Sequence, residues 1–490
     1  MTSMKNSAAQ RPIDVVIMAA GKGTRMKSAL PKVLHRLGGK PLLQHVLDTA
    51  ALLNARQAVV ITGHASGVVQ DAINKIALQA INTPDTAQKT IYSQIASVLQ
   101  EPQLGTGHAV QQALPALPDD GMVLVLSGDV PLTQATTLQA LIAATGGDKL
   151  ALLTIDFVNP TGYGRVVRQD GVADGAVQAI VEQKDANETQ KQITEIYSGI
   201  MAVPANLLKA WLARLDNKNA QNEYYLTDIV KFAVSDGMTV VAHKINDAAQ
   251  VAGVNSPVQL ADLERTFQLR QAQQLMEQGV RIADPARFDV RGSLTCGEDV
   301  EIDINCIFAG EVVLGNQVHI GAHCHISNAR IADGAVIHPY THIDGEKLGV
   351  TVGEGALVGP FARLRPGALL GKDVHIGNFV EVKNATLAEG AKANHLAYLG
   401  DATVGERVNF GAGSITANYD GANKHRTVIE ADVHIGSNCV LVAPITVGAG
   451  GTVGGGSTLT KSTADNALTV SRAKQISIAN WKRPAKAAKK

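Results

Sequence analysis

Short apolar runs typical of buried strands punctuate the first half of the chain. They lie at 13–18, 58–62, 122–127 and 150–155, and helical patterns lie between them, as at 41–53 and 135–145. Alternating strands and helices predict an α/β, Rossmann-like domain with an open, mostly parallel sheet, which we place at residues 1–257. Sheets of this kind bind ligands beyond the carboxyl ends of their strands, so we expect a site at that edge.

Residues 258–279 have a different character. Leu263, Phe267 and Leu275 fall on roughly one face of this segment when it is drawn as a helix. The pattern predicts a long helical linker between two domains.

From about residue 294, an aliphatic residue recurs every six positions, often with Gly or another small residue after it. The repeat comprises Leu314, Ile320, Ile326, Ile331, Ile337, Ile343, Val352, Val358, Leu364, Leu370, Ile376, Val382, Ile429, Ile435, Leu441, Val447, Val453 and Leu459. A six-residue repeat is the signature of a parallel β-helix, in which three short strands make one triangular turn of ~18 residues. We assign this domain, with the C-terminal tail, to residues 280–490.

Interruptions of the six-residue repeat predict loops, and its regular parts predict flat faces on which copies of the chain could pack. The phase slips near 327–331, 344–351 and 411–428, where we expect protruding loops. The flat faces of such a prism commonly pack against copies of themselves, so we expect a homotrimer.

Composition excludes several classes of protein. Lys+Arg and Asp+Glu number 44 each, so nothing indicates a nucleic-acid partner. The four cysteines form no C-x-x-C pair, which argues against a disulfide scaffold and a zinc site. Without a ~20-residue apolar run or the apolar core of a signal peptide, we expect no membrane span and a cytoplasmic enzyme. The basic tail WKRPAKAAKK is either a solvated end or a contact to anionic ligands.

The loop after the first strand reads AAGKGTRM and is followed by Pro31 and Lys32. Two close glycines after a strand let backbone N–H groups approach a phosphate, and Arg25 and Lys32 add positive charge. The loop is neither a Walker motif nor the dinucleotide-binding pattern. It therefore predicts phosphate binding of another kind.

Further motifs make a family resemblance specific. They are PKVL at 31–34, QLGTGHA at 103–109, GDVPL at 128–132, GYGR at 162–165, EYYLTD at 223–228 and GVN at 253–255. With the hexapeptide domain, they resemble the bacterial bifunctional N-acetylglucosamine-1-phosphate uridylyltransferase/glucosamine-1-phosphate acetyltransferases, from about residue 13 to 484. The resemblance implies a left-handed β-helix, Mg²⁺, and acetyl-CoA and UTP as co-substrates. It also implies a role in supplying peptidoglycan and lipopolysaccharide precursors.

The resemblance implies roles for residues of the first domain. The positions that match nucleotide contacts are Met18, Ala19, Ala20, Gly21, Arg25 and Lys32, with Gln100, Gly105 and Thr106 at the uracil. Asp129 and Asn255 match the ligands of Mg²⁺, and Gly164, Glu182 and Tyr197 match sugar contacts. Two residues depart from the family: Tyr197 replaces a usual Asn, and Ser127 replaces a usual Tyr. The stretch 77–96 is longer than in relatives, and we interpret it as a surface loop or altered helix without a catalytic role.

Polar residues that break the repeat predict a second site. His395 matches the family's catalytic base, and imidazole suits proton removal from an amine near neutral pH. Arg365 and Lys383 match phosphate contacts, and Tyr398, Asn409 and Lys424 match further sugar and phosphate contacts. The positions that match acetyl-CoA contacts are Ala412, Asn418, Tyr419, Lys424, Ser437, Gly455 and Arg472.

Two alternatives stay open at this point. One is another sugar-1-phosphate nucleotidyltransferase whose repeats only regulate or assemble it. The other is a trimeric scaffold without activity. The residues Arg25, Lys32, Asp129 and His395 favour the two-site enzyme.

Overall fold

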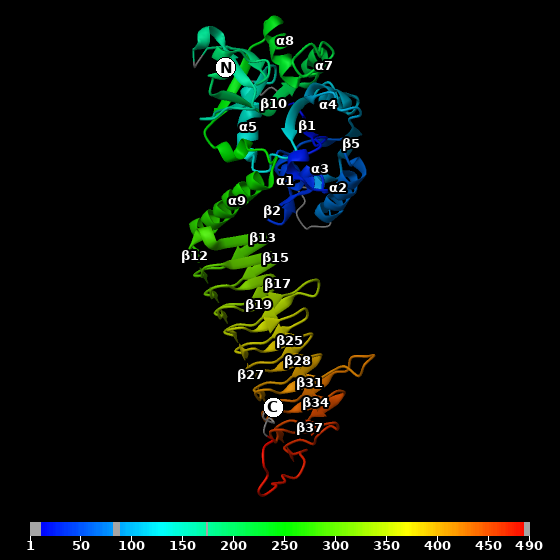
Figure 1. The fold of residues 1–490 in the computed structure, drawn as a ribbon, viewed down its shortest axis with the longest axis vertical. Helices are drawn as coiled ribbons and strands as arrows, with labels where there is room; N and C mark the ends of the chain where they lie inside the picture. The colour runs from blue at the N-terminus through cyan, green and yellow to red at the C-terminus, as the bar shows by residue number, and fades with distance from the viewer. Residues whose placement is uncertain (1–10, 82–88, 173–174, 485–490) are drawn as a thin grey trace, which may run out of the picture. The chain divides into compact units, whose positions relative to one another are not determined.

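The computed structural model describes residues 11–81, 89–172 and 175–484 (Figure 1). The chain forms two compact units, one ending at Phe267 and the other beginning at Gln268. Each unit has its own core.

The first unit is built on one large sheet. Its main strands are β1 (Ile13–Met18), β4 (Gln57–Thr62), β5 (Ile95–Leu99), β6 (Met122–Ser127), β7 (Leu150–Asp156), β10 (Glu195–Pro204) and β11 (Val240–Ile245). Their order is β11-β7-β10-β6-β1-β4-β5, and β10 alone runs antiparallel to its neighbours in this path. The antiparallel pair β8 (Arg165–Arg168) and β9 (Val177–Val181) attaches to β10. The predicted α/β class and mostly parallel sheet are confirmed.

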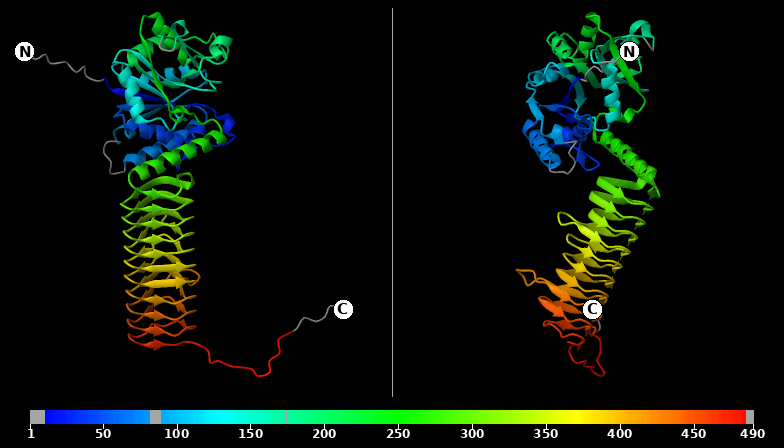
Figure 2. Two further views of the ribbon diagram at one scale, coloured as in Figure 1. Left: turned by 90° about the vertical axis from the view of Figure 1, so that its left-hand side faces the viewer. Right: turned by 180° about the vertical axis from the view of Figure 1, so that it is seen from behind.

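Helices cover both faces of this sheet (Figure 2). Along β1, Val15 and Ile17 face a core with α1 (Leu42–Ala51), α2 (Ser66–Ile81) and α5 (Ala135–Ala144). Val16 faces the opposite core, with α4 (Thr106–Ala113), α7 (Ala205–Leu212) and α8 (Ile229–Ser235). Because strand side chains alternate between faces, one apolar run supplies both cores.

The long stretch at 77–96 is mostly helical where the structure describes it. Helix α2 continues to Ile81, and α3 (Lys89–Tyr92) precedes β5. Residues 82–88, which carry part of the expected surface loop, lie outside the described residues.

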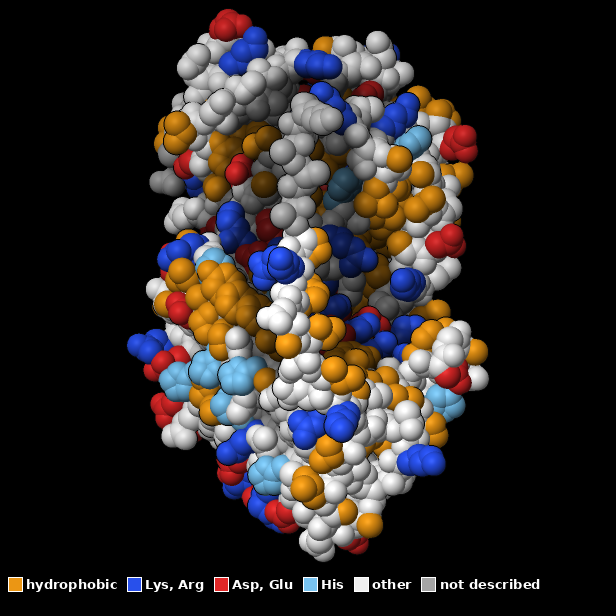
Figure 3. All heavy atoms as spheres, turned by 60° about the horizontal axis from the view of Figure 1, so that its bottom comes forward, with side chains coloured by type: hydrophobic (Ala, Val, Ile, Leu, Met, Phe, Trp, Pro, Cys, Tyr) orange, Lys and Arg blue, Asp and Glu red, His pale blue; other side chains and the backbone are white. Residues whose placement is uncertain are grey.

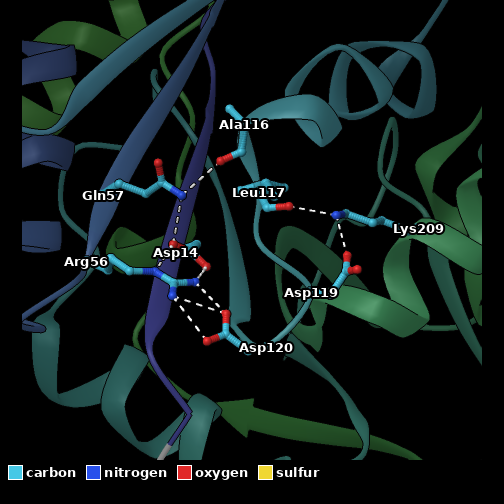
Figure 4. Close-up of polar contacts among 8 residues, drawn as sticks. All are labelled: Asp14, Arg56, Gln57, Ala116, Leu117, Asp119, Asp120 and Lys209. Atoms are coloured by element: carbon cyan, nitrogen blue, oxygen red, sulfur yellow. Dashed lines mark hydrogen bonds and ion pairs between the residues drawn. The ribbon is translucent and has the colours of Figure 1, made fainter.

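A buried carboxylate stabilises the base of β1. Asp14 is fully buried and accepts hydrogen bonds from Arg56 at 3.0 and 2.6 Å and from Gln57 at 3.0 Å. Arg56 also contacts the exposed Asp120 at 3.1 Å (Figure 4). The buried charge is therefore paired and fully supplied with donors.

Helix α9 (Pro257–Glu277) contributes to the core of each unit separately. In the first unit, Leu263 and Phe267 join a cluster with Met26 and Leu37. In the second, Leu275 joins the prism core. The predicted helix is present within two residues of its expected ends.

The second unit is a prism of stacked coils whose strands all pair in parallel. The aliphatic residues of the six-residue repeat all point inward, and none is more than 3% exposed. One face is formed by a column of strands that includes β21 (Leu357–Val358), β24 (His375–Asn378), β27 (Lys392–His395), β30 (Asn409–Phe410), β33 (His434–Ile435) and β36 (Thr452–Val453). The predicted parallel β-helix is confirmed.

Two of the three expected loops are present. One lies between β19 (His342–Asp344) and β20 (Val350–Val352), and the longer one between β31 (Ile415–Ala417) and β32 (Thr427–Ile429). The loop expected at 327–331 is wrong, because β17 (His325–Ile331) runs through it. Asn328 takes a left-handed conformation (φ 46°), and the pairing with β15 (Cys306–Leu314) shifts register there. A bulge thus absorbs the slip without a loop.

Other sequence expectations concern metals, thiols and membranes. All four cysteines are free, and burial raises the pKa of Cys306 to about 11. Across the described ranges, no three or more His, Cys, Asp or Glu side chains group as a metal site. Within the same ranges, no helix has the length and apolar character that a membrane crossing needs.

Replacement of Asp14 by Ala is expected to destabilise the first unit. Arg56 and Gln57 would lose a buried acceptor, at a cost of ~3 kcal/mol in the free energy of unfolding. Asp120→Ala removes an exposed partner of the same Arg56, which water screens, and should change the free energy of unfolding far less. Urea unfolding of the full chain measures both, and equal effects would contradict this account.

Candidate active sites

The first candidate site lies where β1 and β6 end. Gly128 donates its N–H to Met18 at 2.9 Å, so the residues that follow the two strands are held side by side. Ala19 and Ala20 are buried behind the exposed Gly21. Gly23 has φ 60°, and a side chain there would meet Lys32 Cβ at 2.7 Å. A glycine therefore lets the loop fold back over Lys32.

Three residues from distant segments converge at this edge. Lys32 Nζ lies 2.5 Å from Asp129 Oδ2 and donates to Asn255 Oδ1 at 3.0 Å. Val254 N–H donates to Asp129 O at 2.9 Å and fixes the GVN turn against the GD turn. One carboxylate oxygen and one amide oxygen thus point at the same cationic atom.

Tyr163 lies within the electrostatic reach of this cluster. Burial raises its pKa, Asp129 adds to the shift, and Arg25 opposes it. Arg25 itself is exposed on the glycine loop, where its guanidinium is available to an anion.

The residues expected at the uracil lie directly after β5 and at the start of α4. Gln100 is buried, and its amide donates to Gly105 O at 2.9 Å. Gly105 has φ 111°, and a side chain there would meet Tyr224 O at 2.7 Å. Leu226 N–H donates to Thr106 Oγ1 at 3.1 Å, so the EYYLTD segment packs on the QLGTG loop. A concave surface nearby is lined by Lys22, Gly63, His64, Gln100 and Gln103.

The residues expected at the sugar form a separate group. Tyr197 N–H donates to Gly164 O at 2.9 Å, and Glu182 Oε1 accepts from Thr227 at 3.0 Å. Burial raises the pKa of the Glu182 carboxyl. Tyr197 is buried, and its hydroxyl has no hydrogen-bond partner within the described part of the chain. The residue that departs from the family pattern thus has an enclosed hydroxyl that no described side chain or backbone group pairs.

The second candidate site lies on one face of the prism and the two corners beside it. Register stacks Arg363, Glu381 and Tyr398 on successive coils of that face. His395 stands at one corner, where its Nδ1 lies 2.7 Å from Asn378 Oδ1. Its ring is exposed and open to a ligand.

Cations gather at the other corner. Lys424 and then Arg365 lower the pKa of Lys383 by repelling its charge. Glu381 offsets part of this charge through Arg365 at 2.7 Å and Arg363 at 3.5 Å. The excess of cations over carboxylates makes this corner suited to a phosphate.

The long loop between β31 and β32 is anchored by a buried acid. Asp401 accepts from Asn384 and Asn418 at 2.5 Å each. Tyr419 and Lys424 pair across the loop as an isolated bridge. These contacts hold Asn418, Tyr419 and Lys424 near the cationic corner.

Small residues occupy the corner position of His395 on the following coils. Backbone bonds run from Gly413 N to His395 O at 3.3 Å, from Asn438 N to Ala412 O at 2.8 Å and from Gly456 N to Ser437 O at 2.7 Å. His395, Ala412, Ser437 and Gly455 therefore stack in one column. Arg472 lies beside its end, with Cδ 3.7 Å from the Cβ position of Gly456. Asn409 is exposed at the opposite end of strand β30 from this column.

Comparison with known proteins bears on both domains. Residues 15–170 match the MobA-like NTP transferase domain, and residues 349–384 match the bacterial transferase hexapeptide (six repeats). The "Bifunctional protein GlmU" of Polaromonas sp. (strain JS666 / ATCC BAA-500) is 72% identical over 482 residues, which cover 98% of this chain and 99% of that protein. The protein of the same name from Herminiimonas arsenicoxydans is 54% identical over 474 residues, which cover 97% of this chain and 99% of that protein.

The chain belongs to the bifunctional GlmU family. The resemblance inferred from the motifs is confirmed, as is the pairing of a nucleotidyltransferase with a hexapeptide transferase domain. The chain is therefore a bifunctional transferase.

Several residues near the second candidate site escaped the sequence analysis. Glu381 and Asn378 fall at outward positions of the repeat, where polar residues carry no distinctive signal. An aromatic ladder of His323, Tyr340, Phe361 and Phe379 runs along the His395 corner, with ring centroids 4.8 to 5.4 Å apart. All four residues have positive φ, and the last three are about half exposed. Figure 3 shows one face of the molecule on which histidines gather beside hydrophobic side chains.

Loss of a cation from the second candidate site should weaken binding of a sugar phosphate. Lys383→Ala removes a charge from the corner and should raise the Kd for glucosamine 1-phosphate about tenfold. Lys372→Ala, which removes a lysine paired with Glu354 at 3.0 Å on another coil, should leave it unchanged. Calorimetric titration separates the two, and equal affinities would count against a phosphate at this corner.

Proposed function

We propose that the chain makes UDP-N-acetylglucosamine in two steps. The prism transfers acetyl from acetyl-CoA to glucosamine 1-phosphate, and the first unit then couples the product to UTP and releases pyrophosphate. The observation that carries the proposal is that His395 and a cationic corner flank the same face of the prism, on a chain that also gathers Lys32, Asp129 and Asn255. Acetyl-CoA and UTP are cytoplasmic metabolites, so we propose a cytoplasmic location.

The first unit would act by positioning and charge neutralisation. A phosphate oxygen of the sugar attacks the α-phosphorus of UTP while Lys32 and Arg25 bind the polyphosphate. Asp129 and Asn255 would hold Mg²⁺, because their oxygens already converge on the Lys32 ammonium and Mg²⁺ prefers such oxygen ligands. When bound, the ion supplies charge neutralisation at the phosphates.

Pocket residues of the first unit would select the substrates. Gln100, Gly105 and Thr106 would read the uracil, and Gly164, Glu182 and Tyr197 would hold the sugar. The unpartnered hydroxyl of Tyr197 supports a polar contact to the sugar at this position.

The prism would act by general base catalysis. Arg365, Lys383 and Lys424 hold the sugar phosphate, and Tyr398 and Asn409 complete the contacts to the sugar. His395 takes a proton from the amine as the nitrogen attacks the thioester carbon. The column of Ala412, Ser437 and Gly455, with Asn418, Tyr419, Lys424 and Arg472, would hold acetyl-CoA.

We further propose a homotrimer in which neighbouring chains complete the acetyl site. Exposed aromatic side chains beside His395 support an interface there, since contiguous apolar surface of this kind marks protein contacts. The regulatory and scaffold alternatives lack a reason for a histidine and a cation cluster on one face. Incubation with acetyl-CoA, glucosamine 1-phosphate, UTP and Mg²⁺ separates the three functions, and release of both free thiol and pyrophosphate supports two active sites. If free thiol is absent but pyrophosphate is released once N-acetylglucosamine 1-phosphate is supplied, the prism is regulatory. If neither product is released, the protein is a scaffold.

Single substitutions should separate the two activities. His395→Ala is expected to lower acetyl transfer by ~10²-fold or more while uridylyl transfer is kept, because the general base is lost. Asp129→Ala should do the reverse, because Mg²⁺ loses its carboxylate. Thiol release and pyrophosphate release measure the two reactions. If either substitution silenced both activities in a folded protein, the two-site proposal would be wrong.

A further inference from the structure

Asn378 faces the base that the proposed function assigns to the acetyl site. Strands β24 and β27 pair in parallel with Asn378 opposite His395, and Asn378 Oδ1 lies 2.7 Å from His395 Nδ1. Both residues end their strands directly before the corner residues Phe379 and Leu396, whose φ angles are 57° and 51°. The backbone therefore fixes this side-chain pair from both coils.

We propose that Asn378 is a positioning residue that sets the tautomer and orientation of His395. This inference rests on the proposed acetyl transfer. An amide oxygen can only accept a hydrogen bond, so Nδ1 must carry the hydrogen. The lone pair is then on Nε2, which is the atom that takes the amine proton.

The proton balance of the step follows from this tautomer. The neutral amine nitrogen bonds to the thioester carbon and passes one proton to Nε2. The carbon–sulfur bond breaks, and the imidazolium gives that proton from Nε2 to the leaving sulfur. The products are the amide and the free thiol, and His395 Nδ1 keeps its hydrogen throughout, donated to Asn378 Oδ1.

The neutrality of the partner matters as much as its position. His319 and His425 contact carboxylates at 3.0 and 2.6 Å, whereas His395 bonds to an amide and, among the described residues, to no carboxylate. A carboxylate would favour the imidazolium, which cannot accept a proton. An amide fixes the ring and leaves it free to act as a base.

Other titratable groups surround the pair without replacing it. His375 on β24 interacts electrostatically with both His395 and Lys392 of β27. Glu381 and Tyr398 stand on the adjoining face, where Glu381 is engaged by Arg365 at 2.7 Å. None of these is bonded to the His395 ring within the described chain, so Asn378 is the residue to test.

Two substitutions at Asn378 test the inference in the full-length protein. Asn378→Ala should lower kcat of acetyl transfer by ~10- to 100-fold, as loss of an orienting partner does, with KM for both substrates within about threefold. Asn378→Asp keeps the shape and adds a charge. It should move the acid limb of the kcat–pH profile upward by roughly one unit and recover activity at high pH.

A matched control removes another asparagine that links two coils. Asn316 donates to Asp333 Oδ2 at 3.0 Å and accepts from Glu298 N at 2.9 Å, far along the chain from His395. Asn316→Ala should leave kcat and the pH profile unchanged, as should uridylyl transfer in every variant.

The outcomes separate this inference from the proposed function. The positioning role would be overturned if Asn378→Ala had the same kcat as Asn316→Ala. It would also be overturned if Asn378→Asp had the same pH profile as the unchanged chain. Absence of thiol release from the unchanged chain would instead overturn the proposed acetyl transfer. If Asn378→Ala does not fold, the near-isosteric Asn378→Asp still decides through its pH profile.

Discussion

Parallel register between neighbouring strands is the constraint on which both candidate sites depend. In the first unit, β1 pairs with β4 on one side and β6 on the other, so the loops after these strands meet at one edge. In the prism, the same kind of pairing stacks residues of successive coils into columns. Backbone hydrogen bonds thus decide which side chains become neighbours, and the side chains supply only the chemistry.

Much of the fold could be predicted because the spacing of apolar residues along the chain shows directly which positions are buried. Every sixth residue of the repeat was predicted to point into the prism, and Leu314 and Val453 are buried as this spacing requires. The bulge at Asn328 could not be predicted, since a slip in period looks the same whether a loop or a bend absorbs it.

Side-chain neighbours across coils were harder to predict than the coils themselves. Asn378 and His395 are 17 residues apart, whereas Ala412 and Ser437, which occupy the same column, are 25 apart because a loop intervenes. The column can be drawn only when each loop length is known. Motif matching located His395 and Lys383, but not Asn378 or Glu381, because single polar residues at outward positions resemble ordinary surface.

The column below His395 also has a metric consequence. Adjacent strands in a sheet are ~4.8 Å apart, so the three steps from His395 through Ala412 and Ser437 to Gly455 span ~14 Å. The number of coils between two positions of the prism therefore sets the distance between them. A carrier whose reactive end reaches His395 while its far end lies near Arg472 must have a linear arm of about that length, and inserting or deleting one coil would change the length by a fixed increment.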